Sequence, residues 1–253
     1  MTPPPPDRPR GVQSVDRTLD ILELLASSPD PVGVTEVSRR LGLAQGTAHR
    51  LLGALVQRGW ARHDAGRRYA VGPAAMRVGD AAYRALGSSA GPVLRDAVQA
   101  TGETANLAVL EGTQMVYVAQ APSPHTLRIF AEVGRRVPLH STAVGKVALA
   151  RMAPATRRAL LGSGPLPSRT PHTVTTPDRL EAHLVRVHEQ GFALDDEEQE
   201  LGVRCVAVPV PLAGLEVSLS VSGPTERMTP ETARAAVPAL QRLARLLGDS
   251  HSG

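Results

Sequence analysis

The sequence predicts an α+β protein with two domains, on three observations. The chain has 253 residues, which exceeds the usual size of one domain and is long enough for two hydrophobic cores. Before residue 73, apolar residues recur at helical spacing and are followed by a short alternating stretch. After residue 102, strand patterns give way to helical patterns and then return, which favours a sheet covered by helices. We expect these helices to cover one face of that sheet.

The composition is typical of a soluble globular protein, with 42% hydrophobic residues and a mean hydropathy of -0.10. Prolines and charges interrupt the most apolar stretch, residues 203–223, so we expect no membrane span. Prolines also fill the start, MTPPPPDRPRG, where a signal peptide would need an apolar run. We therefore expect a cytoplasmic protein, and its single cysteine agrees with a reducing compartment.

Positive charge is concentrated near the N-terminus, although the net charge of the whole chain is only +4. Residues 35–68 hold seven arginines and only two carboxylates, Glu36 and Asp64. A local basic cluster is typical of nucleic-acid binding proteins. A solvated helix face in an arginine-rich chain would explain the same pattern.

The segment around this cluster predicts a helix-turn-helix. An earlier helix spans residues 14–27, with Ser14 as its N-cap. Thr35 can cap the next short helix, which Gly42 ends, and a further helix runs from about Gln45 to Gln57. In such a motif the second helix offers its first polar residues to the major groove. Those residues are Gln45, Thr47, His49 and Arg50. The pattern alone also fits an ordinary helical hairpin.

A basic hairpin follows directly. Residues 60–63 and 68–71 read as two strands around the turn Asp64-Ala65-Gly66. Its arginines are Arg62, Arg67 and Arg68. A hairpin at this place predicts a winged helix-turn-helix, in which the wing contacts phosphates.

Several segments resemble the IclR family of bacterial transcription regulators, in order and over about residues 12–247. They include VQSVDRTLDILELLA, TEVSRRLGL, RGWARHD, GETANLAVLEG, VPLHSTAVGK and SLSVSGPTERMTPE. The resemblance implies a DNA-binding domain at 12–72, a linker helix at 73–88 and a GAF-like effector-binding domain at 89–249. Residues 1–11 would be a disordered proline-rich tail. One departure is Ala44-Gln45-Gly46-Thr47, where the family usually has Pro, a polar residue, Ser and Thr.

In the second domain the patterns predict six strands and four helices after residue 102. Strands are expected at 103–112, 114–122, 127–134, 192–196, 202–210 and 215–223. Helices are expected at 142–152, 154–162, 177–190 and 230–247.

The stretch DDEEQELGVRC places five carboxylates near the single cysteine, Cys205. It holds no CxxC or HExxH, and no base stands beside the cysteine, so we expect no metal, cofactor or catalytic site. From the residues alone, without the family resemblance, Cys205 is interpreted as a small buried hydrophobic residue. Glu197, Glu198 and Glu200 read as solvated charges.

The resemblance implies instead a site for a small carboxylate-bearing effector. Asp195 and Cys205 match a family Asp and Cys that are ten residues apart, while Ser220 and Ser222 match a Ser-x-Ser-Gly strand. Backbone amides of Ala143 and Val144 would bind an anion at a helix start, and Ile129 and Val137 would form an apolar wall. Val144 narrows the space, which favours a compact ligand.

Together these patterns predict a DNA-binding transcription factor controlled by a small carboxylate- or amide-bearing metabolite. The resemblance implies homodimers or homotetramers on inverted-repeat operators, and a repressor of a catabolic operon is our main hypothesis. An activator is the alternative within the family. From other classes, the alternatives are a metabolic enzyme with a fused DNA-binding domain and a module that only oligomerises.

Overall fold

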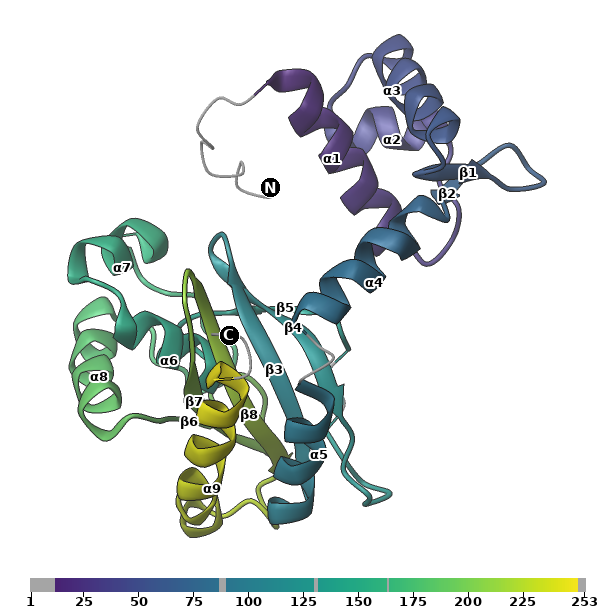
Figure 1. Ribbon diagram of the computed structural model, residues 1–253. Coiled ribbons are helices and arrows are strands. Elements are labelled where there is room, and N and C mark those ends of the chain that lie inside the picture. Colours follow the sequence, from purple (N-terminus) through teal and green to yellow (C-terminus); the bar gives the residue numbers. More distant parts are fainter. Residues whose placement is uncertain (1–11, 87–89, 130–131, 163, 250–253) are drawn as a thin grey trace. The chain divides into compact units, whose positions relative to one another are not determined.

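The computed structural model describes residues 12–86, 90–129, 132–162 and 164–249, and it confirms the α+β class (Figure 1). The chain divides into two compact units, residues 1–82 and 83–253. The predicted tail, residues 1–11, lies outside the described residues. Helix α4 (Ala74–Leu86) covers most of the predicted linker, 73–88, whose role as a linker stays a prediction.

The first unit packs three helices against a small two-stranded sheet. Its elements are α1 (Gln13–Ser27), α2 (Val34–Leu41), α3 (Gln45–Gln57), β1 (Ala61–His63) and β2 (Tyr69–Val71). Ile21, Val37 and Leu52 are fully buried in their common core. Gly42 ends α2 in the left-handed conformation, as predicted, with φ of 61°. The short turn that follows places α3 directly after α2.

Both predicted N-caps in this unit are wrong. Helix α1 begins one residue before Ser14, with Val12 at its N-cap, and α2 begins at Val34, with Gly33 at its N-cap. Neither cap residue offers a side-chain acceptor. At α2 the carbonyl of Gly33 accepts the N–H groups of Glu36 and Val37. Backbone conformation thus places Thr35 inside the first turn, where its hydroxyl does not cap the helix.

The predicted hairpin is present, with each strand one residue shorter than expected. Arg62 pairs with Ala70, and His63 with Tyr69. Asp64 closes the turn, because its Oδ1 accepts the N–H of Arg68 at 2.8 Å. Arg67 adopts a positive φ of 57° in this turn.

The second unit is built on one antiparallel sheet of the order β5-β4-β3-β8-β7-β6. Its strands are β3 (Thr104–Glu111), β4 (Gln114–Ala121), β5 (Arg136–Pro138), β6 (Ala193–Asp196), β7 (Val203–Leu212) and β8 (Leu215–Pro224). The remaining helices are α5 (Ala90–Thr101), α6 (Ala143–Arg151), α7 (Pro154–Leu161), α8 (Pro177–Gln190) and α9 (Pro230–Asp249).

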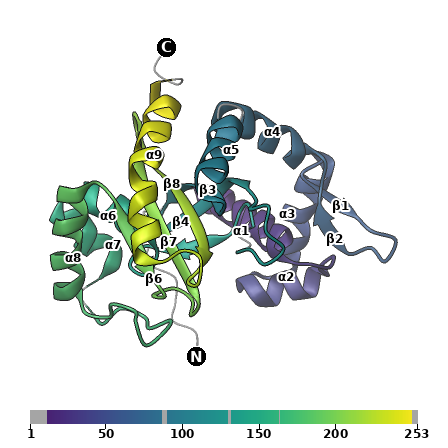
Figure 2. The same cartoon turned by 90° about the horizontal axis from the view of Figure 1, so that it is seen from below.

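Helices cover both faces of this sheet, so the expectation of one covered face is wrong (Figure 2). Helices α5 and α9 pack on the face that carries Val206 and Val208, whereas α6 and α8 pack on the face that carries Ala207. Strand β7 is therefore apolar on both sides, which is typical of a strand buried between two layers.

The strand expected at 127–134 is absent from its described residues, 127–129 and 132–134. Strand β4 pairs with a later segment instead, because β5 joins it at Gln114, Met115 and Val116. Residues 132–135 form a turn that contains Gly134 at φ 91°. This turn follows Ile129, whose carbonyl accepts the hydroxyl of Thr104 at 3.0 Å.

Candidate functional site

The first unit presents its candidate DNA-binding residues on α3 and on the hairpin. Six of the seven are exposed, and Thr47 is half-buried. Leu52 and Ala48 are fully buried and anchor α3 in the core. The amphipathic helix therefore buries its apolar side and leaves its polar start accessible.

The seven residues differ in how far they are already engaged. Arg50, Arg62 and Arg67 make no side-chain hydrogen bond or ion pair within the described part of the chain. Arg68 lies 3.7 Å from Glu36, which also pairs with Arg40 at 2.6 Å. Gln45 Nε2 reaches the hydroxyl of Thr35 at 3.4 Å. The first three arginines are thus the most available for phosphates or bases.

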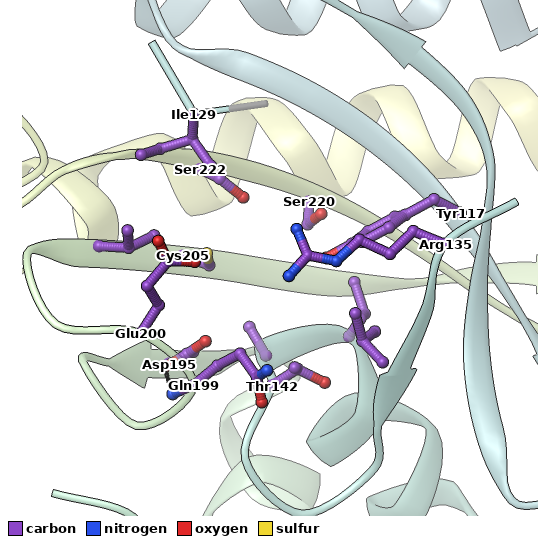
Figure 3. Close-up of a pocket in the computed structure, with 14 residues that line it drawn as sticks. Tyr117, Ile129, Arg135, Thr142, Asp195, Gln199, Glu200, Cys205, Ser220 and Ser222 are labelled. Carbon is purple, nitrogen blue, oxygen red and sulfur yellow. Dashed lines mark hydrogen bonds between the residues drawn. The ribbon is translucent and has the colours of Figure 1, made fainter. Parts of the chain in front are cut away.

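In the second unit, one cavity brings together all eight residues predicted to bind an effector (Figure 3). They are Ile129, Val137, Ala143, Val144, Asp195, Cys205, Ser220 and Ser222. The cavity is small: the centre of a water molecule can move through a volume of about 40 Å³ inside it. Their role in binding stays a prediction.

Strand register explains why residues far apart in sequence converge here. Asp195 lies opposite Cys205 across β6 and β7, and Cys205 lies opposite Ser222 across β7 and β8. Directly paired residues point to the same face of a sheet. The ten-residue spacing from Asp195 to Cys205 is therefore the spacing of facing positions in a hairpin.

The start of α6 supplies two open N–H groups. Thr142 is its N-cap: its hydroxyl accepts the N–H of Gly145 at 3.2 Å, and its carbonyl accepts that of Lys146 at 2.9 Å. Among the described residues, the N–H groups of Ala143 and Val144 have no acceptor, and both residues line the cavity. Two free amides at the positive end of a helix suit an anionic group.

Close backbone packing fixes this helix start. A side chain at Gly145 would place its Cβ 2.4 Å from the backbone of Leu139, so only glycine fits. Ser218 on β8 donates to the carbonyl of Val144 at 3.2 Å. The cavity wall at α6 is thus held against both Leu139 and the sheet.

Asp195 is only 3% exposed, and it organises the turn after β6. Its Oδ1 accepts the N–H groups of Glu198 at 2.8 Å and of Gln199 at 3.2 Å. Burial raises the pKa of this carboxyl to about 7, although the charge of Lys146 and the backbone N–H groups lower it. Asp195 therefore changes charge close to neutral pH.

Cys205 is unsuited to nucleophilic chemistry. Burial raises the pKa of its thiol above the ordinary value, and the carboxyl of Asp195 raises it further. The hydroxyl of Ser222 hydrogen-bonds to it and acts in the opposite direction. A thiol that stays protonated is a poor nucleophile and serves as a small polarisable wall of the cavity.

The carboxylate run beside this cysteine is largely structural, and the expectation that Glu198 is solvated is wrong. Glu198 is 6% exposed and forms an ion pair with Lys146, which is fully buried. Glu197 Oε2 accepts the N–H of Gly202 at 2.8 Å, and Asp196 pairs with Arg204. Glu200 is exposed and lines the cavity. Burial in a low-dielectric interior makes the Lys146 pairing necessary for Glu198.

Six further lining residues were not predicted from the sequence: Tyr117, Arg135, Thr142, Gln199, Glu200 and Val203. Thr142 could have been predicted from the sequence, because threonine is a common N-cap residue and it directly precedes Ala143. Gln199 donates its own N–H to Asp195 and accepts the Ser141 hydroxyl at 2.7 Å. The positions of Tyr117 and Arg135 depend on which segment pairs with β4. The sequence pattern predicted a strand at 127–134, whereas β5 pairs there instead.

The described residues contain no cluster of three or more His, Cys, Asp or Glu side chains placed to hold a metal ion. Within the same residues, every helix is too short or too polar to cross a lipid bilayer.

The fold and these two sites define a class of protein: a transcriptional regulator with a winged helix-turn-helix and a ligand-binding domain. The match to family models makes this specific. Residues 14–65 match the IclR helix-turn-helix domain, and residues 82–248 match the bacterial transcriptional regulator IclR C-terminal domain. The chain therefore belongs to the IclR family of DNA-binding transcriptional regulators. The matching relatives are named as transcriptional regulators, which agrees with the expectation that this chain is not an enzyme.

Characterised relatives cover most of the chain. The HTH-type transcriptional regulator BhcR of Paracoccus denitrificans is 40% identical, over 94% of this chain and 86% of its own. The transcriptional repressor IclR of Escherichia coli is 34% identical, over 86% of this chain and 82% of its own. A solved IclR transcriptional regulator from Silicibacter sp. TM1040 has a TM-score of 0.86 and 29% identity, over 95% of this chain and 96% of its own.

Proposed function

We propose that this protein represses a catabolic operon in the cytoplasm and is released from its operator by a small carboxylate- or amide-bearing metabolite. The observation that carries the proposal is the cavity, in which two free helix amides and two serines converge. An effector carboxylate accepts from the N–H groups of Ala143 and Val144 and from the hydroxyls of Ser220 and Ser222.

Ser220 adds a specific reason to expect a ligand. Its hydroxyl is buried and has no hydrogen-bond partner within the described part of the chain. Such a group is costly unless a ligand or water satisfies it. The limited volume of the cavity supports a compact effector, as the bulk of Val144 does.

The protein acts as a homodimer or homotetramer on an inverted repeat. Exposed apolar side chains at the N-cap and first two turns of α1 support pairing through the first unit: Val12, Val15 and Leu19 are 68%, 53% and 51% exposed. Their spacing places them along one side of the helix start. Two-fold pairing of recognition helices reads two half-sites about one helical turn apart.

The repressor assignment is supported by the name of the Escherichia coli relative, a transcriptional repressor. Effector binding favours a state that fits the operator poorly, which requires a higher affinity of the effector for that state. An activator would instead need the effector-bound state to bind DNA or polymerase productively.

The experiment is a gel shift with the DNA upstream of the protein's own gene, combined with a thermal-shift screen of small oxo-acids, ureides and sugar acids. An effector at a hundredfold excess over its Kd stabilises the protein by about 2.7 kcal/mol. Cys205→Ala and Ser222→Ala should each retain operator binding and lose part of the effector response. If both variants release the operator at the wild-type effector concentration, the cavity is not the effector site.

A further inference from the structure

Arg135 is an exposed cation on the wall of the cavity. Among the described residues that line the cavity it is the only positive charge. Its guanidinium makes no hydrogen bond or ion pair with any residue in the described part of the chain. Its neighbour Arg136 differs, because it pairs with Glu111 at 3.1 Å.

The backbone holds Arg135 in place. Its carbonyl accepts the N–H of Tyr117 at 3.1 Å, and its own N–H donates to Glu132 at 3.0 Å. Gly134 donates to the carbonyl of Tyr117 at 2.7 Å, which closes this turn against β4. In Figure 3 the guanidinium points from this side into the space bordered by Cys205 and Ser220. The turn before β5 therefore fixes where this side chain leaves the backbone.

The charge of Arg135 bears on the choice between an anionic and a neutral ligand. Serine hydroxyls and backbone amides can donate to a carboxylate and also to the carbonyl of a neutral amide. The ionisable groups on the opposite walls, Asp195 and Glu200, repel an anion, and Lys146 is already paired with Glu198. Without Arg135 the amides at the start of α6 would be the remaining feature of the lining that favours an anion, against the two carboxyl groups. A guanidinium forms paired, charge-assisted hydrogen bonds with a carboxylate.

We propose that Arg135 is the specificity-determining residue of the effector site and makes it select a carboxylate over the matching amide. This rests on the proposed function, which leaves both classes open. The carboxylate receives hydrogen bonds from the guanidinium of Arg135 and from the buried, unpartnered hydroxyl of Ser220.

The test compares matched acids and amides on the full-length protein: lactate with lactamide, succinate with succinamide, and benzoate with benzamide. Binding is measured by thermal shift and calorimetry. The wild type should bind at least one acid more tightly than its amide. Arg135→Gln removes the charge and leaves a shorter polar side chain, so acid affinity should fall about tenfold to a hundredfold. Amide affinity should change little.

Two variants make the result specific. Arg136→Gln is the matched control. It should leave both affinities unchanged, because Arg136 forms an ion pair with Glu111. Arg135→Lys should keep part of the preference for acids. The proposal is overturned if the wild type binds no acid in the panel, if it binds amides as tightly as acids, or if Arg135→Gln loses no acid affinity.

Operator binding measured in parallel separates this proposal from the proposed function. If the wild type binds operator and responds to amides alone, the proposed function stands and the proposed role of Arg135 is wrong. A wild type that binds no promoter fragment contradicts the proposed function, whatever the acids do.

Discussion

Several charges of the helix-turn-helix unit are exposed and unpaired within the described residues, whereas one charged pair beside the cavity is buried. Arg50, Arg62 and Arg67 extend into solvent, while Lys146 and Glu198 neutralise each other inside the second unit. Exposed charges contribute little to stability and act on a partner in a salt-dependent way. Buried charges must be matched for the fold to persist. Charged groups thus stabilise the interior of the second unit, whereas on the first unit they remain open to a partner.

The largest expected effect comes from breaking the buried pair. Lys146→Met leaves Glu198 without its cation in a buried position and should destabilise the protein by about 3 to 5 kcal/mol, measured by chemical denaturation. The matched control lies on the same helix: Arg151→Met breaks the exposed pair with Glu216 and should cost less than about 1 kcal/mol. Equal losses for the two variants would show that Lys146 and Glu198 are not buried as described.

The second effect concerns pH. The unfolded chain releases the Asp195 proton near pH 4, and the folded chain near pH 7. Between these values the folded state holds a proton that the unfolded state lacks, so this residue lowers stability as pH rises and has no further effect above pH 7. Asp195→Asn should remove that decline, seen as a gain in Tm over wild type that grows from pH 5 to pH 7.

Asp196→Asn is the control for this prediction, because its exposed carboxylate pairs with Arg204. It should not show a gain that grows over the same pH range. A constant difference between Asp195→Asn and wild type across pH 5 to 7 would mean that the pKa of Asp195 is not raised.

Next comes the exposed surface. Arg50→Ala should weaken operator binding about tenfold or more without changing Tm, because a base or phosphate contact contributes about 1 to 3 kcal/mol. Arg58→Ala, at the other end of α3, is the control and should have a smaller effect. Fluorescence anisotropy over a range of salt concentrations measures both. Unchanged affinity for Arg50→Ala would remove this residue from the interface.

The smallest effect tests the start of α3. A Cβ at Gly46 would meet no atom within 4 Å, so Gly46→Ala should stabilise the first unit by up to about 1 kcal/mol. Gly42→Ala should do the opposite, because Gly42 has a positive φ of 61°. Thermal unfolding distinguishes the two, and a loss of stability in Gly46→Ala would indicate that this turn is not helical.

The order of elements could be predicted from the sequence where periodicity was strong. Helix α3 has the predicted bounds, and the spacing of Asp195 and Cys205 anticipates their facing positions in β6 and β7. Such local patterns carry their own geometry. The two misplaced N-caps show the limit, because backbone carbonyls can satisfy a helix start without a side chain.

Long-range partners were less accessible. Nothing near Glu198 in the sequence indicates that it would be buried and paired with Lys146, 52 residues earlier. Arg135 and Tyr117 were missed because residues 127–134 alternate like a strand, yet β4 pairs with Arg136–Pro138 instead. That choice depends on which edge is free once the sheet has formed, which is a property of the assembled domain.

The contact between Gly145 and Leu139 has a mechanical consequence. Two backbones touch there with no side chain between them to absorb displacement. Any shift of the first turn of α6 must therefore push the segment that follows β5, and through it the outer edge of the sheet. A molecule bound to the amides of Ala143 and Val144 would therefore displace a helix start that is packed tightly against its neighbour, and not a loose helix end.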